Sequence, residues 1–220
     1  MTPSLEYPDG LARINLDSVE SDLESQGIDN VCGVDEAGRG PLAGPVVAAA
    51  VIVPHDIALE GVDDSKKLSP IQRDRLFETI VALDLPCAVG IIDHQDIDRM
   101  NIRKASLMAM RKAVMDLKRA PGFVLVDGNA AIPRLGFPQL TVVGGDARCR
   151  SIGAASIVAK VTRDRIMDRY QGMFPSFSFA KHKGYPTPQH LAELREHGPC
   201  DIHRRTFRPV AELIEQYSLF

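Results

Sequence analysis

Acidic residues follow three apolar segments of this chain, and their type and placement suit metal-assisted chemistry. They are Asp35 and Glu36 after residues 31–34, Asp127 after residues 123–126, and Asp146 shortly after residues 142–143. Acids at the ends of strands can converge in a crevice of a sheet, where carboxylates repel one another unless a cation lies between them. Because Mg²⁺ and Mn²⁺ prefer oxygen ligands, these acids predict a divalent metal site.

A site of this kind could hydrolyse a phosphodiester. Two ions roughly 3.5–4 Å apart would activate a water molecule and stabilise the leaving oxygen. The alternative for any one acid is a turn cap, since Asp127-Gly128 is a common turn pair. Three acidic positions together, one of them with an adjacent Glu, favour metal binding over three separate caps.

The adjacent pair Asp35 and Glu36 poses a geometric problem. Neighbouring residues of a regular strand point to opposite faces of the sheet. If both side chains face one metal site, either the strand is distorted near Gly38 or Glu36 reaches round from the following loop. We therefore expect an irregular backbone at this position.

The apolar pattern predicts the elements that must position these acids. Expected strands span 31–35, 45–53, 87–92, 123–126 and 140–143, and expected helices span 16–24, 69–83, 101–119, 151–170, 188–197 and 209–217. The run 45–53 suits a strand covered on both faces, and Ser69-Pro70-Ile71-Gln72 has the residues of a capping box. This order predicts an α/β protein with one mixed sheet flanked by helices and a helical tail.

The composition limits the class of protein. A length of 220 residues predicts one domain with a small appendage. The four cysteines lie far apart without a Cys-x-x-Cys pair, which is typical of a reducing compartment. No basic amino-terminal segment leads into an apolar run, and the longest apolar stretch is too short to span a bilayer. We expect a cytoplasmic protein without a membrane partner.

The net charge of −3 conceals an asymmetry along the chain. Residues 1–30 carry seven acids and one base, whereas residues 146–208 carry twelve Lys and Arg against six acids. The basic third indicates a polyanionic partner such as a nucleic acid, although a solvated surface would give the same excess.

Several longer motifs resemble those of one known family. In chain order they are residues 33–44 (GVDEAGRGPLAG), 64–69 (DSKKLS), 126–129 (VDGN), 145–146 (GD), 154–164 (AASIVAKVTRD), 182–187 (HKGYPT) and 203–207 (HRRTF). Together, over residues 30–210, they closely resemble bacterial ribonuclease HII, the type 2 ribonuclease H family. Long motifs in the right order make this resemblance far more specific than a single Gly-rich loop.

The resemblance implies an RNase H-like fold and cleavage of the RNA strand of RNA–DNA hybrids, including single ribonucleotides embedded in DNA. It implies Mn²⁺ or Mg²⁺ at a two-metal site and products with 3′-hydroxyl and 5′-phosphate ends, as in ribonucleotide excision repair. By motif, Asp35, Glu36 and Asp127 correspond to metal ligands and Asp146 to the fourth carboxylate. Three segments are then expected: an extension at 1–30, a catalytic core at 31–170, and a substrate-binding carboxyl-terminal part at 171–220.

Two further motifs are expected to contact substrate. Small residues on both sides of Arg39 let the backbone of Gly38-Arg39-Gly40 approach a ligand, and the resemblance assigns this loop to the 2′-hydroxyl of RNA. Tyr185 could stack on a sugar or base, and the resemblance places it at the RNA–DNA junction. From the residues alone, a tight turn with a solvated Arg explains the loop equally well, and a half-buried structural Tyr is the better explanation for Tyr185.

Basic residues near these motifs are candidates for phosphate contacts. They are Lys66, Lys67, Lys181, Lys183, Arg204 and Arg205, of which Lys66 and Lys183 belong to the expected substrate-binding set. We expect His182 and His203 to be neither metal ligands nor general bases, because a metal-bound water needs no histidine.

The last five residues suggest a partner. Gln216, Tyr217, Ser218, Leu219 and Phe220 resemble the peptide with which bacterial replication proteins bind the sliding clamp, except that Tyr217 replaces the usual Leu. A last helical turn packed on the core is the alternative. The chain is otherwise expected to act as a monomer.

Two other functions remain open from the sequence. One is a different two-metal enzyme on the same fold, such as a junction resolvase or an integrase-like strand transferase. The other is a binding protein for hybrids or RNA without catalysis, which would have no use for carboxylates directed at phosphates.

Overall fold

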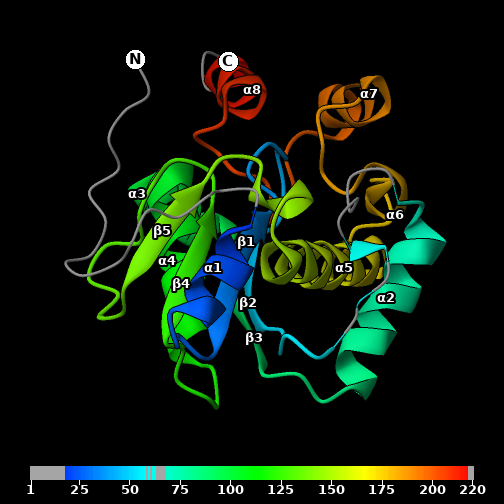
Figure 1. Cartoon of the computed structure of the whole chain (residues 1–220). Coiled ribbons are helices and arrows are strands. Elements are labelled where there is room, and N and C mark those ends of the chain that lie inside the picture. Colours follow the sequence, from blue (N-terminus) through cyan, green and yellow to red (C-terminus); the bar gives the residue numbers. More distant parts are fainter. Residues whose placement is uncertain (1–17, 58, 60, 63–67, 218–220) are drawn as a thin grey trace.

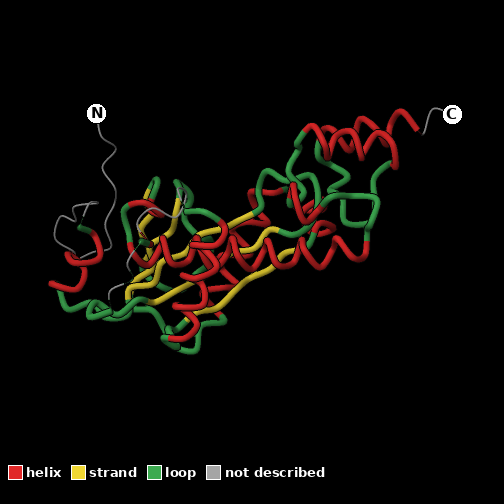
Figure 2. Tube along the Cα trace, turned by 90° about the vertical axis from the view of Figure 1, so that its right-hand side faces the viewer, coloured by secondary structure: helices red, strands yellow, loops and turns green. Residues whose placement is uncertain are grey.

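The computed structural model describes residues 18–57, 59, 61–62 and 68–217. The expectations for Lys66, Lys67 and the clamp-like residues 218–220 lie outside these ranges. The chain forms a mixed sheet with helices on both faces, and further helices lie at one end of the molecule (Figures 1 and 2). Within the described ranges, no helix is long and apolar enough to cross a membrane.

The sheet has five strands in the spatial order β3-β2-β1-β4-β5. Their bounds are β1 Val31–Ala37, β2 Val46–Ile52, β3 Cys87–Ile92, β4 Phe123–Asp127 and β5 Gln139–Val142. Strands β1, β4 and β5 run parallel, whereas β2 is antiparallel to both of its neighbours. The predicted mixed sheet is confirmed.

Eight α-helices and a short 3-10 helix accompany the sheet in the described part of the chain. Their bounds are α1 Val19–Ser25, α2 Pro70–Ala82, α3 His94–Met100, α4 Ile102–Met115, α5 Arg150–Met173, α6 Phe179–His182, α7 Pro188–His197, α8 Arg208–Tyr217 and the 3-10 helix Gly145–Ala147. Helix α4 covers one face of the sheet, and α5, with α2 behind it, covers the other (Figure 1). We call these the α4 face and the α5 face.

Both faces are tightly packed near the middle of the sheet. Every residue of β2 is buried, because both α4 and α5 contact this strand. Strand β1 carries Gly33 toward α5, where an added Cβ would lie 2.1 Å from the main-chain carbon of Ser151. A glycine at this position therefore lets the backbone of α5 lie directly on the strand.

The carboxyl-terminal helices form a separate apolar cluster at the end of the molecule beyond the sheet (Figure 2). Helices α6, α7 and α8 pack around Phe177 and Phe179, and also against Leu42 and Ala43 of the loop that follows β1. This contact places residues 174–217 beside the loop that contains the Gly38-Arg39-Gly40 motif.

Several predicted boundaries are corrected by the structure. Asn101 starts no helix that runs on to Arg119; instead it separates α3 from α4 with a φ of 78°, and its side chain caps α4 by accepting from the Lys104 N–H. Helices α3 and α6 were not predicted. The capping box of α2 is confirmed, since Ser69 and Gln72 exchange two hydrogen bonds of 2.8 and 3.3 Å.

Candidate active site

The acids after β1 and β4 lie together because these strands are parallel neighbours. Their pairing ends at Val34 and Val126, one residue before Asp35 and Asp127. Asp35 has the same strand parity as Gly33 and is hydrogen-bonded to Ser156 of α5. Because side chains alternate along a strand, Asp127 also lies on the α5 face. The predicted convergence of these two carboxylates at one end of the sheet is therefore confirmed.

The expected irregularity at Glu36 is wrong. Strand β1 continues to Ala37, and Asp35, Glu36 and Ala37 pair with consecutive residues of β2 without a bulge. Glu36 therefore points toward the α4 face. Because β4 ends at Asp127 and no longer flanks residues 35–37, Glu36 still shares a small cavity with Asp127, lined on the other side by Arg103 of α4.

Burial and neighbouring charges raise the pKa values of Asp35 and Glu36. Burial raises the pKa of Asp35 to about 8, and the charges of Asp127 and Glu36 add to this effect. Burial also raises the pKa of Glu36, partly offset by Arg39, whose Nη1 lies 3.1 Å from Glu36 Oε1. Carboxylates that are desolvated and crowded together in this way fit a site completed by a cation.

Asp146 lies next to this cluster on the 3-10 helix and is 2% exposed. The preceding Gly144 has a left-handed backbone, and Gly145 N–H donates a 2.8 Å hydrogen bond to Asp127 Oδ1. Among the described residues, no three His, Cys, Asp or Glu side chains are gathered closely enough to hold a metal ion as they stand. The donor chemistry of the four acids nevertheless fits Mg²⁺ or Mn²⁺.

Two buried arginines shape the loop 38–45 beside these acids. Arg204 donates five hydrogen bonds, to the carbonyl oxygens of Gly38, Arg39, Pro41, Gly44 and Pro45. Arg163 donates three, to the carbonyl oxygens of Ala43, Pro45 and Lys183. At Gly38, with a φ of 99°, an added Cβ would lie 2.2 Å from Arg163 Nε, so only glycine fits there.

This arrangement corrects the prediction for Arg204. The residue was expected to contact phosphate, but it is 0% exposed and its guanidinium is directed at main-chain carbonyls of the loop. Arg163 was not singled out from the sequence. Its neighbours along α5 are charged, so nothing in the local pattern distinguishes it from a solvated residue.

Tyr185 and the Gly38-Arg39-Gly40 loop lie side by side, although they are far apart in sequence. Leu42 N–H donates a 2.7 Å hydrogen bond to Gly184 O, and an added Cβ at Gly40 would lie 3.7 Å from Tyr185 Cε1. Glu36, the loop and the Tyr185 ring line one cavity of about 420 Å³, together with Arg73, Ser156 and Lys160. The structure therefore brings the predicted substrate-contacting motifs beside the carboxylates.

The remaining basic residues have different surroundings. Lys183 forms an ion pair with Asp168 and lines a neighbouring cavity rather than the one that contains Tyr185. Lys181 and Arg205 are exposed, so their predicted phosphate contacts stay predictions. Arg73, Arg103, Ser156 and Lys160 were missed, because only the packing of α2, α4 and α5 brings them to the site.

Comparison with known sequences places this chain in a family. The family model of ribonuclease HII matches residues 32–210. Ribonuclease HII of Geobacter metallireducens is 52% identical over 204 residues, covering 93% of this chain and 95% of the relative. Ribonuclease HII of Endomicrobium trichonymphae is 48% identical over 205 residues, covering 93% and 98%.

Solved structures show the same fold. Ribonuclease H2 from Pyrococcus horikoshii aligns with a TM-score of 0.71 and 27% identity, covering 86% of this chain and 98% of that one. The PCNA:RNase HII complex from Archaeoglobus fulgidus contains a chain with a TM-score of 0.71 and 30% identity, covering 83% and 96%. Bst-RNase HIII in complex with Mn²⁺ shares the fold at 18% identity, with a TM-score of 0.68 over 91% and 74%.

The mixed sheet, with carboxylates at the shared end of parallel strands, thus defines an enzyme of the RNase H-like fold. The chain belongs to the ribonuclease HII family. It is an endoribonuclease that cleaves the RNA strand of RNA–DNA hybrids.

Proposed function

We propose that this ribonuclease incises at single ribonucleotides embedded in DNA as well as within longer hybrids, by two-metal-ion hydrolysis that leaves 3′-hydroxyl and 5′-phosphate ends. The observation that carries the proposal is the position of the crowded carboxylates. Glu36 lines the cavity of the Tyr185 ring and the Gly38-Arg39-Gly40 loop on one side, and shares a second cavity with Asp127 on the other.

Asp35, Glu36, Asp127 and Asp146 would hold Mn²⁺ or Mg²⁺. When bound, such ions supply an activated water and stabilise the leaving oxygen. They would also offset the burial and the carboxylate repulsion that raise the pKa values of Asp35 and Glu36. The residues of this chain then have to place one phosphodiester next to the acids and distinguish a ribose from a deoxyribose.

The loop is suited to reading a 2′-hydroxyl through its backbone. Arg204 donates hydrogen bonds to the Gly38 and Arg39 carbonyl oxygens, so both carbonyls point toward its guanidinium. In a trans peptide the N–H points opposite to the C=O, so the N–H groups of Arg39 and Gly40 point away from Arg204. We propose that these donors face the ribose, and that the exposed Tyr185 ring packs on the sugar at the junction.

The test is a duplex with one ribonucleotide in a DNA strand, incubated with Mg²⁺ or Mn²⁺ and again with EDTA. We expect a single incision at the ribonucleotide, with the stated ends, and no product in EDTA. Equal cleavage of an all-DNA junction would instead favour a resolvase or strand transferase. Binding without any cleavage would favour a non-catalytic hybrid-binding protein.

We also propose that the carboxyl-terminal residues Gln216–Phe220 bind the sliding clamp. Helix α8 ends at Tyr217, and the archaeal relative in the PCNA complex is itself bound to a clamp protein. Replacing Leu219 and Phe220 by Ala should abolish binding to an immobilised clamp without changing hydrolysis, and Tyr217→Leu should strengthen binding. Unchanged affinity in the double Ala variant would contradict this proposal.

A further inference from the structure

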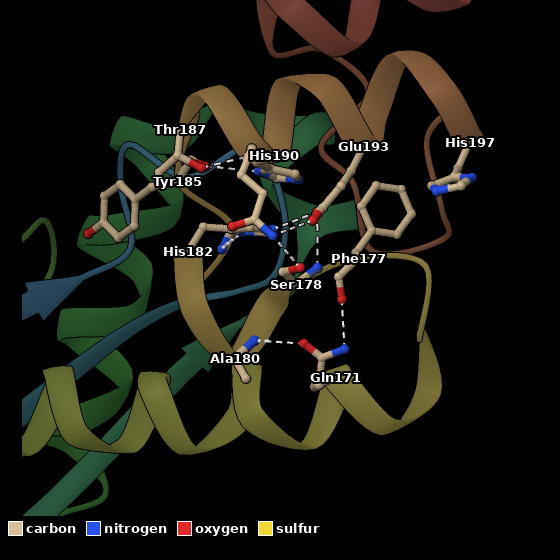
Figure 3. Close-up of polar contacts among 12 residues, drawn as sticks. Gln171, Phe177, Ser178, Ala180, His182, Tyr185, Thr187, His190, Glu193 and His197 are labelled. Atoms are coloured by element: carbon tan, nitrogen blue, oxygen red, sulfur yellow. Dashed lines mark hydrogen bonds and ion pairs between the residues drawn. The ribbon is translucent and has the colours of Figure 1, made fainter.

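Three buried histidines lie between the carboxyl-terminal helices, behind the Tyr185 loop. The rings of His182 and His190 stack with centroids 4.1 Å apart and planes 10° from parallel (Figure 3). His203 contacts His190 from the segment before α8, and Phe177 and Phe179 surround the group. The described function assigns no role to these residues.

The hydrogen bonds fix which nitrogen carries the proton in two of these rings. Cys200 N–H donates to His203 Nδ1 at 3.0 Å, so neutral His203 carries its proton on Nε2. That Nε2 lies 3.0 Å from His190 Nε2, which must then accept. The proton of His190 is therefore on Nδ1, which lies 2.9 Å from the carbonyl oxygen of Tyr185.

Both rings are held in the neutral form. Protonation of either one would place two N–H groups against each other at the Nε2–Nε2 contact. Burial lowers the pKa of His190 to about 4 and that of His203 to about 3, and each of the two also has a neighbouring histidine that lowers its pKa further. Glu193 accepts from the Nε2 of His182, the third ring. The hydrogen bonds from Cys200 N–H through His203 and His190 to the Tyr185 carbonyl oxygen, which we call the histidine chain, therefore all donate in the same direction.

The last hydrogen bond of the histidine chain, from His190 to Tyr185 O, affects the position of the Tyr185 ring. That ring is 38% exposed, so burial alone does not orient it. Its peptide is held on both sides: Tyr185 N–H donates to His182 O at 2.8 Å, and Tyr185 O accepts from Thr187 N–H as well as from His190. The position of the ring over Lys160 and Arg163 therefore depends on a main-chain segment that His190 holds.

The loop 38–45, on the other side of the cavity from Tyr185, also contacts the histidine chain. Ala43 pairs with His203 in an isolated β-bridge, and Gly44 N–H donates to Ile202 O at 2.9 Å. The loop that follows Gly38-Arg39-Gly40 is thus attached to one end of the histidine chain, and the Tyr185 peptide to the other.

We propose that His190 is a positioning residue: its Nδ1–H, oriented through His203, fixes the peptide of Tyr185 and so sets the distance between the Tyr185 ring and the Gly38-Arg39-Gly40 loop. This inference rests on the proposed role of Tyr185 at the ribose of the junction. It makes selection of a single ribonucleotide depend on a buried side chain that never touches substrate.

Two variants of His190 separate its two hydrogen bonds. In His190→Asn the amide nitrogen takes the place of Nδ1 and keeps the bond to Tyr185 O, while the contact with His203 is lost. In His190→Gln the amide oxygen takes the place of Nε2 and still accepts from His203, while the bond to Tyr185 O is lost. Each variant leaves one buried hydrogen bond unmade, so a purely structural role predicts equal effects.

The readout is the ratio of kcat/KM on a single-ribonucleotide duplex to kcat/KM on a long hybrid, measured with Mn²⁺. We expect His190→Gln to lower this ratio about fivefold or more, which corresponds to one hydrogen bond, and His190→Asn to preserve it. In a Tyr185→Ala background His190→Gln should cause no further decrease. An equal loss in both His190 variants, or an additive loss with Tyr185→Ala, overturns the inference.

Histidine ¹⁵N spectra test the same chain without activity. We expect Nδ1–H in His190 and Nε2–H in His203, with Tyr185 ring resonances shifted in His190→Gln and not in His190→Asn; the opposite tautomers overturn the inference. If Tyr185→Ala leaves the substrate ratio unchanged, the role of Tyr185 at the junction is wrong. The spectra then decide separately whether His190 positions the ring.

Discussion

Buried polar groups have opposite surroundings at the acidic end of the sheet and in the carboxyl-terminal part of the chain. At the sheet end, burial raises the pKa values of Asp35 and Glu36, and the charge of Asp127 raises both further. In the carboxyl-terminal part, Arg204 and His190 are fully buried, yet hydrogen bonds satisfy them in fixed directions. The acids at the sheet end therefore fit a site that a bound cation completes, whereas the hydrogen bonds of Arg204 and His190 fix the conformation of the loops beside it.

The difference also appears in what each buried charge is directed at. Burial of a cation is costly, and it lowers the pKa of Arg204 to about 9, so the group remains charged near neutral pH. Five carbonyl oxygens of one loop compensate for this cost. Satisfied polar networks can specify a unique conformation, which is what the proposed reading of one hydroxyl by this loop would require.

The largest expected effect separates function from stability at the acidic end. Asp35→Asn should lower the rate of hybrid hydrolysis about 10³-fold, since a metal ligand contributes several kcal/mol to the transition state. Without metal, the same variant should be more stable in urea than the parent protein, because a buried carboxyl group whose ionisation is disfavoured by burial and by its acidic neighbours is gone. Asp116→Asn, at an exposed helix end, is the control and should change neither quantity.

Removing the buried charge of Arg204 should lower stability, unlike removal of the Asp35 carboxylate. Arg204→Met leaves the loop carbonyls unpaired, and we expect the free energy of unfolding to fall by about 3–5 kcal/mol. Its exposed neighbour Arg205→Met should cost less than about 0.5 kcal/mol. Urea unfolding of the two variants side by side provides the measurement; similar midpoints would mean that Arg204 does not organise the loop.

Acid should weaken the histidine network specifically. The pKa of His190 is lowered to about 4 in the folded protein, against about 6.5 in an unfolded chain. Between these values the unfolded state binds more protons, so stability falls as pH decreases from about 6.5 to 4, by up to about 1.4 kcal/mol per pH unit. The advantage of the parent protein over His190→Asn should therefore shrink across this window. A constant difference would show that His190 titrates normally.

A smaller effect concerns helix α1, for which the sequence suggested no role. Glu20 accepts from the N–H groups of Arg150 and Ser151 at 2.8 and 2.9 Å and so caps the start of α5. Glu20→Gln should lower the free energy of unfolding by about 1 kcal/mol, through the loss of a charged cap at the positive end of the helix. Glu24→Gln on the same helix serves as the control, and equal midpoints for the two variants would refute the capping role.

The sequence predicted what depends on local pattern. Apolar runs identified all five strands, and the Ser69–Gln72 box marked the start of α2, because these signals reside in a few consecutive residues. The convergence of Asp35 and Asp127 also followed, since acids after neighbouring parallel strands meet at one edge. These features need no knowledge of distant contacts.

The misplaced features depend on contacts between distant segments. Arg204 is buried because it meets a loop about 160 residues earlier in the chain, and no local pattern distinguishes it from exposed Arg205. The expected irregular backbone at Glu36 was wrong because β1 stays regularly paired with β2 through Ala37, although β4 stops at Asp127 and no longer flanks it. Asn101 divides two helices through a positive φ that the apolar period does not reveal.

The most direct test of the central claim is a Mn²⁺ titration of the protein without substrate, followed by electron paramagnetic resonance of the free ion. The parent protein should bind Mn²⁺ saturably, and Asp35→Asn and Asp127→Asn should each lose most of this affinity, while Asp116→Asn retains it. Binding of Mn²⁺ by Asp35→Asn and Asp127→Asn with the affinity of the parent protein would contradict the assignment of the sheet end as the metal site.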